Sequence, residues 1–95
     1  MIGADILDYV ILKLGSYVAS GIPKREENKT NKTIDVLLDI KDNRKVSNKD
    51  ILNALLYALK KLGDFSMEYE INTKEFEEID KVYDELYNII KNKKY

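Results

Sequence analysis

Apolar and polar residues follow one another along this chain with two different periods. Three stretches repeat their apolar residues every three or four positions, which places those residues on one face of a helix. These stretches are residues 4–20, 47–62 and 73–92. Two other stretches, residues 33–41 and 65–71, alternate apolar and polar residues one by one, as a half-buried strand does. The predicted order of elements is therefore α-β-α-β-α.

The helix at 47–62 has the clearest boundaries. Ser47 and Asp50 have the spacing of a capping box, in which the hydroxyl accepts from a free amide of the first turn. Val46 and Ile51 flank this cap at the spacing of a hydrophobic staple. Gly63 follows the last leucine of the apolar stripe, where glycine favours a left-handed end to the helix. We expect this helix to lead directly into the strand at 65–71.

The other two helices differ in character. Residues 4–20 carry only a narrow polar stripe, which is typical of a helix buried in the core or at a subunit interface. The helix at 73–92 can be capped by either Asn72 or Thr73. It carries glutamates in its first turn and lysines at its end. The helix dipole favours that order of charges.

The segment between the first two apolar stretches is the hardest to assign. Residues 24–32 contain no apolar side chain, which predicts a solvated, mobile loop. Residues 33–41 alternate well enough to favour a strand. A helix that uses Ile34, Leu37 and Leu38 as its apolar face is the open alternative.

These elements predict a single α+β domain over residues 1–95. Two strands alone make a marginal sheet. Either a partner chain supplies further strands, or three helices cover one face of a small sheet. The strand count favours a homodimer, while strand order and direction stay open.

The composition excludes several classes of chemistry. The chain has no cysteine and no histidine, which removes disulfides, thiolate metal sites and the commonest general base. It has neither a phosphate-binding loop nor a dinucleotide-binding motif. We therefore expect a non-enzymatic protein without a cofactor or a bound metal. No apolar run reaches the length of a membrane span, so we expect an intracellular protein.

Charge is spread unevenly along the chain, although the net charge is only −1. Residues 24–33 carry four positive and two negative charges. Residues 64–90 carry nine negative and two positive charges, and residues 91–95 add three lysines. The sequence therefore predicts an acidic C-terminal third with small basic patches.

Four carboxylates would share the solvent face of the predicted sheet: Asp35, Asp39, Glu68 and Glu70. Alternating acidic residues are the ordinary pattern of a wet strand face. A Mg²⁺ or Mn²⁺ site is the minor alternative. A third interpretation is an acidic recognition face for a basic partner.

Two basic groups are candidates for contact with nucleic acid phosphates. The first lies in the polar run and comprises Lys24, Arg25, Lys29 and Lys32. The second is the C-terminal group Lys91, Lys93 and Lys94. A soluble loop and a complement to the helix dipole are the plainer interpretations, and Lys60 with Lys61 is read in the same way.

The expected function is a non-enzymatic protein-interaction module of the adaptor or inhibitor type, acting as a homodimer on an unidentified protein partner. The alternative is a nucleic-acid-binding regulator that uses the basic loop and tail. The net charge of −1 and the presence of only two arginines, the usual base-reading residue, weigh against that alternative.

Overall fold

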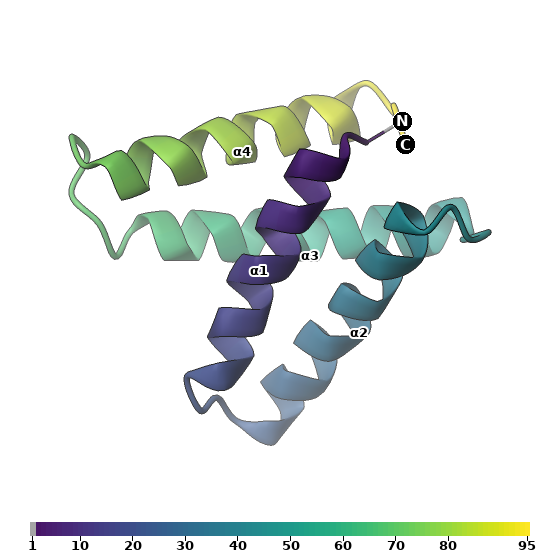
Figure 1. Cartoon of the computed structure of the whole chain (residues 1–95), viewed down its shortest axis with the longest axis horizontal. Helices are drawn as coiled ribbons and strands as arrows, with labels where there is room; N and C mark the ends of the chain where they lie inside the picture. Colours follow the sequence, from purple (N-terminus) through teal and green to yellow (C-terminus); the bar gives the residue numbers. More distant parts are fainter. Residues whose placement is uncertain (1) are drawn as a thin grey trace.

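The computed structural model describes residues 2–95 and consists of four helices (Figure 1). Their bounds are α1 Ala4–Ala19, α2 Lys24–Lys41, α3 Asn48–Ser66 and α4 Lys74–Lys91. No strand occurs between residues 2 and 95, so the predicted α+β class is wrong and the domain is all-helical. The strand count that favoured a homodimer therefore no longer supports one, because residues 2–95 form no sheet for a partner chain to complete.

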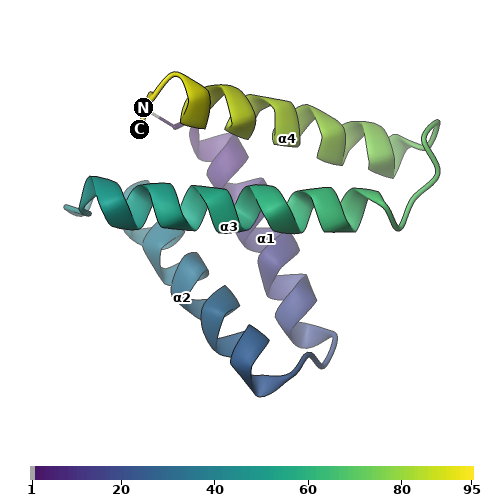
Figure 2. The ribbon, with the colours of Figure 1, turned by 180° about the vertical axis from the view of Figure 1, so that it is seen from behind.

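The helices form two antiparallel hairpins that cross at a steep angle (Figures 1 and 2). One hairpin is α1 with α2, and the other is α3 with α4. α3 is the central helix, because it packs against all three others. In both views α4 and α2 lie on opposite sides of α3.

The core gathers apolar side chains from all four helices. Its fully buried members lie on the inward faces of α1, α3 and α4, and α2 adds one leucine. They are Leu7, Val10, Leu14, Leu37, Leu55, Ala58, Leu62, Ile79 and Leu86. The predicted helices at 4–20, 47–62 and 73–92 are thus confirmed to within a few residues.

α2 replaces both the predicted mobile loop at 24–32 and the predicted strand at 33–41. Its buried positions are Thr30, Thr33 and Leu37, which continue a helical step of three and four. Each threonine hydroxyl donates to the backbone carbonyl four residues earlier, at 2.8 Å for Thr30 and 3.0 Å for Thr33. Threonine can therefore occupy a core position without an unpaired hydroxyl. Because two of the three buried positions of α2 are threonines, the sequence shows no clear apolar stripe there.

The predicted strand at 65–71 is also wrong, because α3 continues through Gly63 to Ser66. Gly63 does not cap the helix. A Cβ atom added there would lie 3.5 Å from the Tyr83 ring, an ordinary van der Waals contact, so the packing against α4 does not require glycine. Phe65 extends the inward stripe and stacks at a tilt on Tyr17, with 5.4 Å between ring centroids. Residues 67–73 form a turn rather than a strand.

The helix caps agree with the sequence more closely. The Ser47 hydroxyl accepts from the Asp50 amide at 3.2 Å, as predicted. The Thr73 hydroxyl accepts from the Phe76 amide at 3.2 Å, so Thr73 rather than Asn72 caps α4. Within residues 2–95, none of the helices has the length and apolar character needed to cross a bilayer.

Candidate functional site

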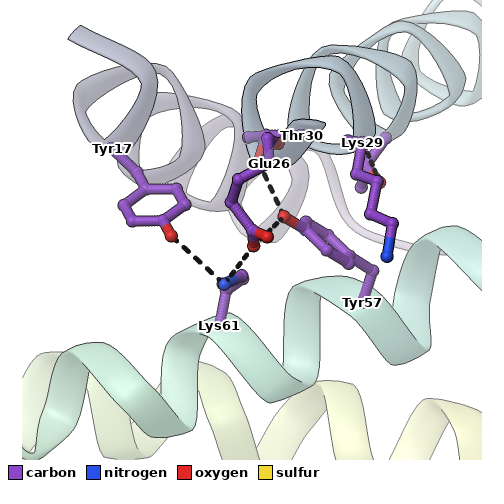
Figure 3. Close-up of polar contacts among 7 residues, drawn as sticks. Tyr17, Glu26, Lys29, Thr30, Tyr57 and Lys61 are labelled. Atoms are coloured by element: carbon purple, nitrogen blue, oxygen red, sulfur yellow. Dashed lines mark hydrogen bonds and ion pairs between the residues drawn. The ribbon is translucent and has the colours of Figure 1, made fainter. Parts of the chain in front are cut away.

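Long polar side chains fill the wedge where the N-terminal end of α2 splays away from α3 (Figures 2 and 3). Three helices contribute to this polar wedge. Its members are Tyr17 of α1, Glu26 and Thr30 of α2, and Tyr57 and Lys61 of α3. Because all five share one hydrogen-bonded network, the wedge ties the two hairpins together.

Lys61 lies at the centre of the wedge and is only 8% exposed. Its ammonium group lies 2.5 Å from the Glu26 carboxylate and donates to the Tyr17 hydroxyl at 3.3 Å (Figure 3). It also lies 4.8 Å from the centre of the Tyr17 ring and 5.5 Å from that of Tyr57. This buried charge is therefore paired with a carboxylate and surrounded by aromatic faces, which attract a cation.

The protonation states of the pair follow from these contacts. Burial, the largest single influence, lowers the pKa of Lys61, but the hydrogen bonds to Glu26 and Tyr17 and the charges of Tyr57 and Tyr17 outweigh it. The pKa of Lys61 therefore lies above its ordinary value. The hydrogen bond from Lys61, joined by one from Tyr57, lowers the pKa of Glu26. Both residues stay charged at neutral pH.

Tyr57 closes the wedge on the side of α2. Its hydroxyl donates to the Glu26 carboxylate at 3.0 Å and lies 2.7 Å from the Thr30 hydroxyl. Burial, together with Glu26, raises the pKa of Tyr57, so this phenol stays neutral. Glu26 and Lys61 stay charged and Tyr57 stays neutral near neutral pH, so these three groups hold the helices in place and do not exchange protons there.

A basic groove runs along the same side of α2 and α3. Two adjoining hollows between these helices are lined by Arg25, Lys29, Lys32 and Lys60, the four residues that define the groove. Positions 25, 29 and 32 are spaced by four and three, so they share one face of α2. In the described part of the chain none of the four makes an ion pair, in contrast to Lys61.

The floor and walls of the groove are less charged than its rim. Val36, Ala54 and Tyr57 supply apolar surface between the helices. Asp50 and Asn53 line the α3 wall, and Glu26 lines the other hollow. Two carboxylates therefore line the groove, of which Glu26 is paired with Lys61. The groove thus combines an apolar floor with a positive rim.

The structure separates the predicted basic residues. Arg25, Lys29 and Lys32 lie in the groove, but Lys24 is paired with Glu27 at 3.4 Å. Lys91, Lys93 and Lys94 lie at and just after the end of α4, next to Tyr95, which lines a hollow with residues of the α2–α3 turn. The N-terminal end of α2 lies far from there (Figure 1). The predicted loop and tail therefore do not form one basic surface.

Lys60 joins the groove from α3, which the sequence alone did not show. It stands next to Lys61, and nothing in that dipeptide tells which lysine turns inward. The helical stripe offers the one usable signal, because Ala54, Ala58 and Lys61 lie three or four positions apart.

The four acidic candidates do not share a face. Asp35 and Asp39 lie one turn apart on α2, and Asp39 is 3.5 Å from Arg44. Glu68 and Glu70 lie in the α3–α4 turn, at the opposite end of α3 from that half of α2 (Figure 1). The predicted sheet face is therefore wrong. The described residues contain no group of three or more side chains able to hold a metal ion.

Comparison with known proteins adds no information to the geometry of the site. No protein-family model, no curated protein and no solved structure matches this chain.

Proposed function

We propose that this domain is a non-enzymatic binding protein that holds the phosphate backbone of a nucleic acid in the basic groove. One observation carries the proposal: Arg25, Lys29, Lys32 and Lys60 line a single groove without acidic ion-pair partners within residues 2–95. A phosphate chain is a partner that can satisfy several such cations in a row. Lys61 takes no part, because Glu26 already neutralises it.

The residue types in the groove favour backbone contacts over base reading. Three of the four cations are lysines, which act on phosphates as point charges. Arginine, which can read guanine with two hydrogen bonds, occurs there once, as Arg25. We therefore expect binding with little dependence on base sequence.

Fluorescence anisotropy with labelled duplex DNA, single-stranded DNA and RNA tests this proposal. Binding should weaken steeply with salt, because bound cations release counterions from the phosphates. Four phosphate contacts predict a slope of about −3 to −4 for log K against log salt concentration on a duplex.

The groove variant Arg25→Ala/Lys29→Ala/Lys32→Ala/Lys60→Ala should lose at least about tenfold in affinity at low salt. The matched control removes four lysines elsewhere, as Lys74→Ala/Lys91→Ala/Lys93→Ala/Lys94→Ala. Equal losses in the two variants would show that binding is not seated in the groove, and no binding at low salt would end the proposal.

One observation also favours the second candidate, a protein-interaction module. The α3–α4 turn, which comprises residues 67–73, exposes Met67 and Ile71 beside Glu68 and Glu70. A turn that presents apolar side chains among carboxylates is a surface suited to a protein with basic and apolar groups.

A further inference from the structure

The α3–α4 turn exposes three apolar side chains although its backbone is held in place. Met67, Tyr69 and Ile71 are 85%, 38% and 72% exposed. The Tyr69 amide donates to the Ser66 carbonyl at 3.3 Å, and the Thr73 amide and hydroxyl donate to the Glu70 carbonyl at 3.1 and 2.7 Å. The turn is thus hydrogen-bonded at both ends, and Met67 and Ile71, its two most exposed apolar side chains, are available to another surface.

The surroundings of this turn are strongly acidic. Between residues 64 and 78 there is one cation, Lys74, against six carboxylates: Asp64, Glu68, Glu70, Glu75, Glu77 and Glu78. None of the six makes an ion pair in the part of the chain that the structure describes. A partner surface that is both apolar and basic would complement these apolar groups and the carboxylates around them.

The basic groove of the same molecule has that composition. Its rim carries four cations without ion-pair partners among the described residues, and its floor carries Val36, Ala54 and Tyr57. The turn cannot fill its own groove, because α3 leads it toward α4, on the side away from α2 (Figures 1 and 2). None of the turn's residues lines the groove.

We propose that the α3–α4 turn of one molecule docks into the basic groove of a second copy. The turn projects from the end of the α3–α4 hairpin (Figure 1). The groove is concave, because it consists of two hollows between α2 and α3. A docked pair keeps the groove of one molecule and the turn of the other free, so the contact is head-to-tail and builds a ring or an open chain. This self-association therefore differs from the symmetric homodimer expected from strand pairing.

The docked turn and a nucleic acid would occupy the same groove. Self-association would then be released by nucleic acid, and nucleic acid binding would be weakened at high protein concentration. Only this competition rests on the proposed function, because the docking itself needs no nucleic acid.

Sedimentation velocity with two charge-reversed variants tests the docking. Glu68→Lys/Glu70→Lys makes both surfaces basic, and Lys29→Glu/Lys32→Glu makes both acidic. Wild type should self-associate at low salt and dissociate at high salt, and each variant alone should stay monomeric. An equimolar mixture should associate again, because each turn then meets a groove of opposite charge. A misfolded variant could not restore assembly.

A neutral pair of variants tests the apolar part of the contact. Ile71→Ser should weaken self-association about tenfold at every salt concentration, because an exposed apolar anchor is lost. Leu12→Ser, at a residue 66% exposed on α1, is the matched control and should leave association unchanged.

The outcomes decide the two proposals separately. A monomeric wild type at low salt, or a mixture that stays monomeric, overturns the docking. Loss of DNA binding in Lys29→Glu/Lys32→Glu with unchanged self-association overturns the docking and leaves the proposed function standing. Restored assembly in the mixture with no binding to any nucleic acid supports the docking and overturns the proposed function.

Discussion

Lys61 has the least ordinary environment of any charged residue in the domain. Its ammonium group is buried between two tyrosine rings and is neutralised by one carboxylate. Removing one partner of a buried pair costs stability when the charge left behind is buried and unpaired. The Lys61 side chain is 10% exposed and that of Glu26 is 30% exposed, so the charge left behind is more deeply buried when Glu26 is the partner removed. The wedge can therefore be tested by unequal substitutions.

Lys61→Met should change the free energy of unfolding by no more than about 1 kcal/mol, because methionine fills the same space and Glu26 reaches solvent. Glu26→Gln should be the more harmful of the two, since it leaves the buried ammonium without its counter-charge. Urea unfolding followed by circular dichroism measures both. A Lys61→Met variant less stable than Glu26→Gln would contradict this assignment.

The same pair predicts how stability depends on pH. The lowered pKa of Glu26 means that its carboxylate contributes stability above the ordinary value of 4.5 and loses it as the pH falls through the lowered value. The raised pKa of Lys61 means that its contribution is complete below 10.5 and is lost only at higher pH. The stability difference between wild type and Lys61→Met should therefore shift toward zero or change sign as acid protonates Glu26. Urea unfolding between pH 7 and strong acid checks this.

Tyr9 offers a third test, because its buried hydroxyl has no hydrogen-bond partner among the described residues. Burial, with smaller effects from Glu78 and Tyr69, raises the pKa of Tyr9 to about 12. Tyr9→Phe removes an unsatisfied polar group, so we expect the free energy of unfolding to stay constant or rise by about 1 kcal/mol. Thermal unfolding measures it, and a clear loss of stability would mean that the hydroxyl is bonded.

α2 shows where an element escapes a reading of the sequence. Its first nine residues contain no apolar side chain, and Thr30 and Thr33 take the core positions that leucine occupies in the other helices. Alternation of Ile34, Val36, Leu38 and Ile40 then resembles a strand. The pattern alone could not decide between helix and strand. Ile34, Leu37 and Leu38 fit one face of a helix, whereas the four alternating residues fit a strand.

A proline substitution separates the helix from the loop predicted for residues 24–32. Asn28 is exposed inside the second turn of α2. Asn28→Pro should cost about 3 kcal/mol, because proline removes a backbone hydrogen bond and clashes with the preceding turn. Asn28→Ala, the control, should cost nothing. Equal stability of the two variants in urea unfolding would show that this segment is not helical.

The three helices were predicted correctly because apolar residues recur in them at helical spacing. Ser47 and Thr73 also cap two of them through local hydrogen bonds. The prediction of a helix end at Gly63 and a strand at 65–71 was wrong for a different reason. Phe65 belongs to the helix, whereas Met67, Tyr69 and Ile71 are exposed, so their apparent alternation joins two unrelated environments.

At the scale of the whole molecule, charge of opposite sign gathers on separate surfaces. Part of the site was predictable, because Arg25, Lys29 and Lys32 were candidates from their clustering in the polar run 24–32. The place of Lys60 in the groove and the separation of the groove from the C-terminal lysines were not predictable, because both depend on how α2 packs on α3. Helix pairing sets which charges meet, and one sequence does not reveal it.

The pairing of the helices has a consequence for the speed of folding. The most extensive contacts join helices that are neighbours in the chain: α1 with α2, α2 with α3 and α3 with α4. Only short loops must close before these contacts form, so little chain entropy is lost before it is compensated. We expect refolding within about a millisecond. Temperature-jump relaxation measures the rate, and a relaxation of seconds would contradict it. A chain that refolds this fast recovers from local opening before its exposed apolar surface meets another unfolded molecule.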